Sequence, residues 1–304
     1  MDGAPALTWL PAMERALAGV PAAASSAQLP RLWLDVGTSE KTLAKWDVLH
    51  NNSLIVVGVD PVLANIEHPS QPATPRFVRI HGACADAPPG NTTLFAHRSP
   101  TCASLLPTRS NAPKLGKGRD ACTGDVPTVV TVPMFPLRLL LRRMQRLARR
   151  VELLKIDVQG SELSCLRSAG AELRHVDNVL LEVQDADASS GLLMYEGAPS
   201  IGELDGLLGG HGLRRQYCEF NQISKQVREI NCLYARSERR ARRLWASGNF
   251  QRGGSMVSYA SMPRFVRQPQ FLTSLRTSAD AGARLHQRPW SLSWPFVAPL
   301  EAMP

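Results

Sequence analysis

The chain has 304 residues, of which 44% are hydrophobic and 20% are charged. This composition is typical of a soluble globular protein and argues against an intrinsically disordered one. No apolar run reaches the roughly 18 residues that a membrane-spanning helix needs, so none is predicted. Residues 1–30 lack the basic start and the unbroken apolar centre of a secretory signal. We therefore expect a cytoplasmic protein, and an organelle transit peptide is the open alternative.

The net charge of +9 is unevenly distributed. From Arg236 onward eleven arginines stand against three acidic residues, which gives +8 in this part alone. The segment 137–150 carries six more arginines. A weak contact of these segments with an anionic surface is one interpretation, and a solvated charged face is the other. Neither predicts a specific nucleic-acid partner.

The six cysteines are scattered, without a C-x-x-C pair and without histidines at zinc-finger spacing. They are Cys84, Cys102, Cys122, Cys165, Cys218 and Cys232. We expect them to be reduced and mostly buried, in a reducing compartment, and we predict no metal site.

The first half of the chain alternates apolar runs with helical stretches. Residues 31–36 and 54–59 are typical of buried parallel strands, and residues 77–80 form a third candidate strand. A helix is expected around 41–49. Residues 86–128 are rich in Pro, Thr, Ser and Gly and are predicted to form loops with little regular structure.

The alternation continues in the second half. Helices are expected at 137–150 and 162–173, with a strand at 153–158 between them and another strand at 178–183. Ser200 should cap a helix that runs to about residue 208, where two glycines end it.

The last two apolar runs, 213–220 and 230–235, are too close together for a parallel crossover, so they should form an antiparallel hairpin at the sheet edge. The whole pattern predicts an α/β fold with a mostly parallel sheet. We divide the chain into an N-terminal extension (1–30), one domain (31–236) and an Arg-rich, weakly ordered C-terminal extension (237–304), with a short helix around 239–243.

The most specific motif runs from Lys155 to Glu162 and reads KIDVQGSE. It places a carboxylate at the end of a buried strand, where open α/β folds bind their ligands. The motif resembles the KIDVEGxE signature of FkbM-type methyltransferases, and residues 99–106 resemble a Ser-rich segment of that family. The resemblance covers about residues 31–236. It implies a Rossmann-like class I methyltransferase fold, S-adenosyl-L-methionine (SAM) as cofactor, and a hydroxyl on a glycan, glycolipid or other small acceptor as substrate.

Strand ends and this resemblance together give the candidate cofactor residues. Gly37 would let backbone amides approach the methionine part of SAM, with Asp35 beside its amino group and Ser39 in the same turn. Asp60 ends the second strand, where an acid would bind the ribose hydroxyls. For Asp35 and Asp60, helix capping is the alternative. Residues Ala83 and Asp86 are candidates for the adenine side, where an ordinary polar loop is equally expected.

Asp157 is the leading catalytic candidate, because a carboxylate there could accept the proton of the acceptor hydroxyl. Glu182, near the end of the next strand, is the second. It forms a weak acidic cluster with Asp185 and Asp187. Glu162 is expected to cap its helix, and Lys155 to be structural or the partner of an acid.

The glycine loop departs from the family pattern. The family has D-x-G-A-N-x-G, whereas this chain has DVGTSEK, with Ser39 in place of Asn and Lys41 in place of the second Gly. This departure leaves a catalytically silent binding or scaffold protein as the alternative. A nicotinamide-dependent enzyme ranks third, because G-x-G-x-x-G is absent, and neither a nucleophile elbow nor a P-loop occurs.

Overall fold

A seven-stranded sheet forms the centre of the protein, with the strand order β3-β2-β1-β7-β8-β10-β9. The computed structural model describes residues 30–40, 42–110, 126–184, 193–223 and 228–247. The strands of this sheet are β1 (Arg31–Val36), β2 (Leu54–Asp60), β3 (Phe77–His81), β7 (Val151–Ile156), β8 (Val176–Gln184), β9 (Arg214–Ile223) and β10 (Arg228–Ala235). Neighbours from β3 to β8 pair in parallel, and β10 runs antiparallel to both β8 and β9. The predicted parallel sheet with an antiparallel edge hairpin is confirmed.

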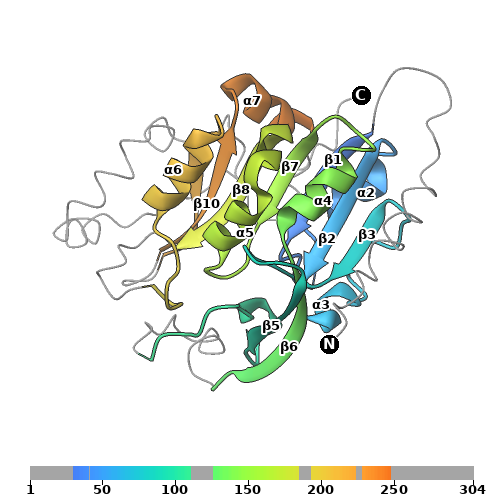
Figure 1. The fold of residues 1–304 in the computed structure, drawn as a ribbon. Helices are drawn as coiled ribbons and strands as arrows, with labels where there is room; N and C mark the ends of the chain where they lie inside the picture. The colour runs from blue at the N-terminus through green and yellow to red at the C-terminus, as the bar shows by residue number, and fades with distance from the viewer. Residues whose placement is uncertain (1–29, 41, 111–125, 185–192, 224–227, 248–304) are drawn as a thin grey trace, which may run out of the picture.

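Helices cover both faces of this sheet (Figure 1). They are α2 (Lys45–His50), α3 (Leu63–Ile66), α4 (Leu137–Met144), α5 (Glu162–Ala169), α6 (Ile201–Gly210) and α7 (Glu238–Ser247), with short 3-10 turns at Pro100–Cys102 and Gly170–His175. The larger core lies between the sheet and α4, α5 and α6. The smaller core lies on the opposite face under α2 and α7. Burial on both faces is why β1, β2 and β7 are almost continuously apolar.

The packed domain extends beyond the predicted boundary at residue 236. Ala241 and Leu244 of α7 are buried in the smaller core, against Leu180 and Leu233 of the sheet. The predicted extensions at 1–29 and 248–304 lie outside the described residues. No helix within the described part of the chain is long and apolar enough to cross a membrane.

A second sheet corrects the prediction of irregular structure over residues 86–128. Strands β4 (Ala83–Cys84), β5 (Gly90–Ala96) and β6 (Thr128–Phe135) form it in the order β4-β6-β5. Its strands β5 and β6 project below the main sheet in Figure 1. Only Leu94 of β5 is fully buried, so the apolar signal was too weak to reveal this strand. Its partner β6 also begins more than thirty residues later, so no local turn marks the pairing. Residues 111–125 lie outside the described residues.

Two helices end earlier than predicted. Helix α4 ends at Met144 instead of Arg150, so only three of the six arginines of 137–150 lie on it. Helix α5 ends at Ala169, because Gly170 adopts a positive φ of 53° and the chain continues as a 3-10 turn. By contrast, Ser200 caps the start of α6 as expected, in a capping box with Glu203, but the helix continues through Gly209 and Gly210, where it was predicted to end.

The expectation of reduced cysteines is wrong. Cys84 in β4 is bonded to Cys165 in α5, and Cys218 in β9 to Cys232 in β10. Cys102 is also disulfide-bonded, and no cysteine in the described ranges is free. Cys218 and Cys232 face each other in the register of the hairpin, whereas Cys84 and Cys165 meet only in the tertiary structure. Spacing along the chain therefore gave no sign of either pair.

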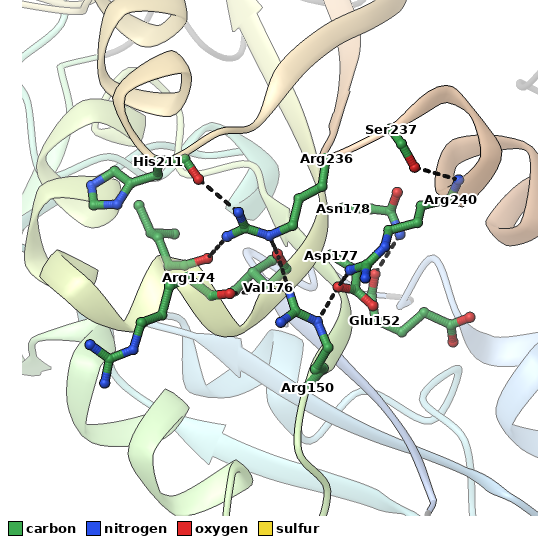
Figure 2. Close-up of polar contacts among 11 residues, drawn as sticks. Arg150, Glu152, Arg174, Val176, Asp177, Asn178, His211, Arg236, Ser237 and Arg240 are labelled. Atoms are coloured by element: carbon green, nitrogen blue, oxygen red, sulfur yellow. Dashed lines mark hydrogen bonds and ion pairs between the residues drawn. The ribbon is translucent and has the colours of Figure 1, made fainter.

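Arg236 follows β10 and connects several elements at the edge of the sheet where the parallel strands begin (Figure 2). Its guanidinium donates to the carbonyl oxygens of Leu173, Val176 and His211, at 2.8, 2.9 and 2.8 Å. Beside it, Arg150 and Arg240 both pair with Asp177 of β8. The contacts join β8, β10, α6, α7 and the 3-10 turn after α5.

Candidate functional site

Lys155 joins the ends of two adjacent strands, because it stands opposite Asp35 in the β1–β7 register. Its Nζ lies 3.2 Å from Asp35 Oδ1 and 3.3 Å from Asp157 Oδ2, and it donates to the carbonyl oxygen of Gly37 at 2.6 Å. Burial would lower the pKa of Lys155, but the attraction of Asp35, Asp157 and Glu182 outweighs burial and raises it. Lys155 is therefore a fixed positive charge at the centre of the site, and it pairs with acidic residues as expected.

Asp157 follows directly after β7. Its backbone N–H donates to Val36, which ties it to the end of β1. Besides Lys155, its carboxylate accepts a hydrogen bond from Gln159 Nε2 on Oδ1 at 3.0 Å. Gln159 Oε1 in turn accepts from the hydroxyl of Tyr195 at 3.0 Å. A chain of two hydrogen bonds therefore runs from Tyr195 through Gln159 to the carboxylate.

The loop after β1 packs directly against the loop after β7. Gly37 has a φ of 80°, and a Cβ at this position would lie 1.8 Å from the carbonyl oxygen of Asp157. No other residue fits there without moving one loop. Asp35 Oδ2 accepts from Thr42 Oγ1 at 2.5 Å and from the N–H of Leu43 at 3.2 Å. It therefore also closes the loop, but it does not cap α2, whose N-cap Ala44 has no side-chain cap hydrogen bond.

Asp60 closes the same loop from the end of β2. Its Oδ2 accepts from the N–H of Ser39, and its Oδ1 from the N–H of Val62 and from Asn65, at 2.9, 2.9 and 3.1 Å. Burial raises the pKa of Asp60, and these three hydrogen bonds partly oppose the rise. A carboxylate has about four acceptor positions, so one is left for a ligand. Lys41, the other departure from the family pattern, lies outside the described residues.

Glu162 begins α5 and points back into the loop that precedes it. Its Oε1 accepts from the N–H groups of Val158 and Gly160, at 3.2 and 3.0 Å. Burial is the largest influence and raises the pKa of Glu162 to about 7, to which the charge of Asp157 contributes. Glu162 stands in the first turn of α5 as expected, but it binds the loop before the helix, and it is a buried acid that titrates near neutrality.

A pocket opens beside this loop, at the carboxyl ends of β7 and β8. Its lining consists of Asp157, Gln159, Gly160, Glu162, Glu182, Val183 and Gln184. The structure thus brings the two predicted catalytic acids, Asp157 and Glu182, to one cavity. Within the described ranges no group of three or more His, Cys, Asp or Glu residues could hold a metal ion. Asp185 and Asp187 lie outside those ranges.

The adenine-side candidates lie farther along the same edge. Gly82 donates to the carbonyl oxygen of Asp60, which places Ala83 just beyond the end of β2. Ala83 itself is buried and paired with β6. Asp86 is exposed, and its N–H donates to Ser164 Oγ of α5 at 3.0 Å, so this amide is already engaged. Ala83 and Asp86 remain predictions as adenine contacts.

Sequence reasoning missed Tyr195 and gave no role to Ser104. Both hold the pocket loop: Ser104 Oγ donates to the carbonyl oxygen of Gln159 at 2.7 Å, and the ring of Tyr195 packs on Gly160. Gln159 itself has a positive φ of 54°. The Ser-rich segment was the available signal for Ser104, whereas Tyr195 lies about 35 residues from the motif and had none.

The residues at the sheet edge fit SAM. Thr38 Oγ1 and Ser161 Oγ are buried after β1 and β7 without a hydrogen-bond partner among the described residues. Unsatisfied buried hydroxyls of this kind are rare and suit the polar amino-acid end of a ligand. Asp35 and the remaining acceptor position of Asp60 would also offer negative charge to SAM, which carries a positive charge on its sulfur.

Comparisons with solved structures find methyltransferases of low similarity. A putative tRNA (m1A22) methyltransferase from Streptococcus pneumoniae, in complex with S-adenosyl-L-methionine, is 14% identical, with 87% of this chain and 85% of that chain covered and a TM-score of 0.30. A mutant 16S rRNA (adenine(1408)-N(1))-methyltransferase from Catenulisporales acidiphilia, with cosubstrate SAM, is 13% identical, with 75% of this chain and 89% of that chain covered and a TM-score of 0.33. No curated protein matches the sequence.

The match to a protein family is more informative. The model of the methyltransferase FkbM domain matches residues 35–217, more than half of the chain. The matched region begins at Asp35 and includes the glycine loop, the KIDVQGSE motif and the pocket. The strand order with its antiparallel β10 agrees with the expected class I methyltransferase fold. The family match also supports the prediction that SAM is the cofactor. The chain therefore belongs to the FkbM methyltransferase domain family.

Proposed function

We propose that the protein is a SAM-dependent O-methyltransferase and that Asp157 is its catalytic base. One observation carries the proposal: the Asp157 carboxylate lies at a pocket on the sheet edge, beside the loop of Gly37, and is held from two sides by Lys155 and Gln159. Bound SAM would supply an electrophilic methyl group on a positively charged sulfur. The protein then has to orient a hydroxyl and accept its proton.

The site residues divide these tasks. Asp35, Gly37, Thr38 and Asp60 would hold the cofactor along the ends of β1 and β2. Asp157 would accept the hydroxyl proton as the methyl group leaves the sulfur and bonds to the oxygen, and Lys155 would hold the carboxylate in place through their ion pair. Glu182, which also lines the pocket, would accept a hydrogen bond from a second hydroxyl of the acceptor.

The acceptor we propose is a neutral hydroxylated compound, such as a sugar unit of a glycan or glycolipid. The pocket lining contains three carboxyl groups and two carboxamides. Such a surface offers acceptors to sugar hydroxyls and repels an acceptor that carries a carboxylate or phosphate close to the reacting oxygen.

Calorimetric titration with SAM, followed by transfer of radiolabelled methyl groups to a panel of neutral methyl glycosides, tests the proposal. Asp157→Asn should leave the Kd for SAM within about twofold and reduce transfer by a factor of about 10² or more. Transfer at the wild-type rate would remove Asp157 from this role. The absence of SAM binding in the wild-type protein would overturn the whole assignment.

A catalytically silent binding protein is the second candidate. The specific observation in its favour is that Asp60 already accepts three hydrogen bonds from its own chain, one of them from the backbone N–H of Ser39 in the altered glycine loop. If this is correct, millimolar SAM should give no binding heat, and Asp60→Ala should change stability alone.

We also propose that the protein works in an oxidising compartment instead of the cytoplasm that its sequence led us to expect. The disulfides support this location, since such bonds persist in oxidising compartments and are rare in the cytosol. Alkylation of intact cells followed by peptide mapping should recover Cys84 joined to Cys165. Recovery of both as alkylated thiols would return the protein to a reducing compartment.

A further inference from the structure

A second charged region lies at the end of the sheet opposite the pocket. Its six arginines, here called the basic surface, are Arg142, Arg146, Arg149, Arg150, Arg174 and Arg240. Four of them are linked by contacts: Glu172 interacts with Arg142 and Arg174, Arg150 donates to the carbonyl oxygen of Arg174, and Arg150 shares Asp177 with Arg240. Arg146 and Arg149 lie in the chain between Arg142 and Arg150.

The basic surface carries more charge than the fold requires. Two acids, Glu172 and Asp177, oppose its six arginines and leave a net charge of +4. Arg236 lies beside Arg150 and donates to three carbonyl groups (Figure 2). Burial and then the repulsion of Arg150 lower the pKa of Arg236, and the attraction of Asp177 partly opposes them.

Most of these side chains are available to a partner. Arg146, Arg149 and Arg174 are exposed, and Arg142 keeps 62% of its side-chain exposure although it pairs with Glu172. Figure 2 shows Arg174 turned away from the cluster around Asp177. Guanidinium groups form paired hydrogen bonds with sulfate and carboxylate groups, and several in one region favour a polymer that repeats such groups.

Two observations decide between acidic polymers. The side chains that make up the basic surface are arginines, which bind anionic groups, and none of them is an aromatic ring of the kind on which single-stranded nucleic acid stacks its bases. The disulfides also indicate an oxidising compartment, where acidic polysaccharides occur. We propose that the basic surface binds an acidic polysaccharide that carries sulfate or uronate groups.

This site is separate from the acidic pocket. Arg150 immediately precedes β7, whereas Asp157 immediately follows it, so the length of the strand, about 20 Å, separates them. The bound polysaccharide should therefore leave the affinity for SAM unchanged. The inference does not depend on methyl transfer, and it can fail or succeed while the proposed function stands.

The test uses the full chain, with heparin as the sulfated polysaccharide and poly(U) as a single-stranded RNA. Arg149→Gln/Arg174→Gln removes two exposed charges from the basic surface. Arg79→Gln/Arg98→Gln, the matched control, removes two exposed charges elsewhere. Dissociation constants are measured at several salt concentrations.

Arg149→Gln/Arg174→Gln should weaken heparin binding about tenfold at 0.15 M salt. It should also reduce the slope of log K against log salt concentration by about one to two. The control should weaken heparin binding less than about twofold. Equal losses of heparin affinity in both variants would show that binding depends on the net charge of the protein or on another segment, and would overturn the proposal. Tighter binding to poly(U) than to heparin would overturn the choice of partner.

Discussion

Gln159 is the residue at which this chain differs from the family signature, which has Glu in its place. A carboxamide can donate to Asp157 and accept from Tyr195 at the same time, and both hydrogen bonds are present. A glutamate could not donate to Asp157 and would place a second negative charge beside it. We therefore regard Gln159 as a positioning residue for the proposed base.

Gln159→Glu should lower kcat about tenfold or more, with a larger loss at low pH than at high pH, because the second carboxylate favours protonation of the acidic pair. The Kd for SAM should change less than about threefold. Tyr195→Phe should give a smaller loss of the same kind. A matched control is Tyr234→Phe, which removes the hydroxyl that donates to Asp205 at 2.8 Å, remote from the pocket, and should leave kcat unchanged. Equal kcat in wild type and Gln159→Glu would contradict this role.

Glu162 should make stability depend on pH. Its pKa rises from 4.5 to about 7 in the folded protein, so the folded state favours the protonated form. The contribution of protonated Glu162 to the free energy of unfolding is fully present below pH 4.5 and is lost as pH rises through about 7. A rise of this size corresponds to about 3 kcal/mol.

In Glu162→Gln this contribution can no longer be lost, because the amide cannot ionise. Between about pH 5 and 8 the free energy of unfolding, measured with urea, should therefore fall less in the variant than in the wild type. Parallel curves for the two proteins would show that Glu162 titrates normally. Glu172, whose pKa is lowered by Gln145 and Arg142, should contribute with the opposite sign at more acidic pH.

At the scale of elements, the two loops after β1 and β7 form one unit. Gly37 is needed because its missing side chain lets the carbonyl oxygen of Asp157 approach. Gly37→Ala should therefore destabilise the fold by about 2 kcal/mol or more and weaken SAM binding, since the loop must move. Gly206→Ala is the control, because a Cβ at Gly206 meets nothing within 4 Å. The free energy of unfolding and the Kd for SAM, measured for both variants, check this expectation.

Arg236 has the same joining role at the opposite edge. Arg236→Lys should cost about 1–3 kcal/mol, because an ammonium cannot reach three separate carbonyl groups with planar geometry. Urea unfolding measures the loss. Affinity for SAM should not change, and a stability equal to that of the wild type would mean that water satisfies the three carbonyl groups.

At the scale of the whole molecule, the disulfides link parts that are distant in sequence. The bond between Cys84 and Cys165 closes a loop of about 80 residues and connects the small sheet to α5, the helix that begins with Glu162. Reduction of the folded protein should lower its Tm, since cross-links of this length commonly contribute about 2–5 kcal/mol.

Cys84→Ser/Cys165→Ser should reproduce most of the effect of reduction on Tm. The Cys218–Cys232 pair closes a much shorter loop, so its removal should cost less. Differential scanning calorimetry with and without reductant measures both effects. A Tm that does not respond to reductant would show that the thiols are free in solution.

The sequence by itself determined the alternation of strands and helices, because apolar runs buried on both faces of a parallel sheet are nearly continuous. It also placed Asp35, Asp60 and Asp157 at strand ends, which a parallel sheet necessarily brings to one edge. The KIDVQGSE motif indicated the family, which the match over residues 35–217 confirms.

Only the tertiary structure decided which of these groups are engaged. Lys155 meets Asp35 through strand register, Tyr195 reaches Gln159 from a segment about 35 residues away, and Cys84 meets Cys165 across 81 positions. Strand β5 was equally hidden, because its pairing partner is distant and its surface is mostly polar. Local patterns report periodicity and turns, whereas these contacts depend on how distant segments pack, which leaves no periodic trace in the chain.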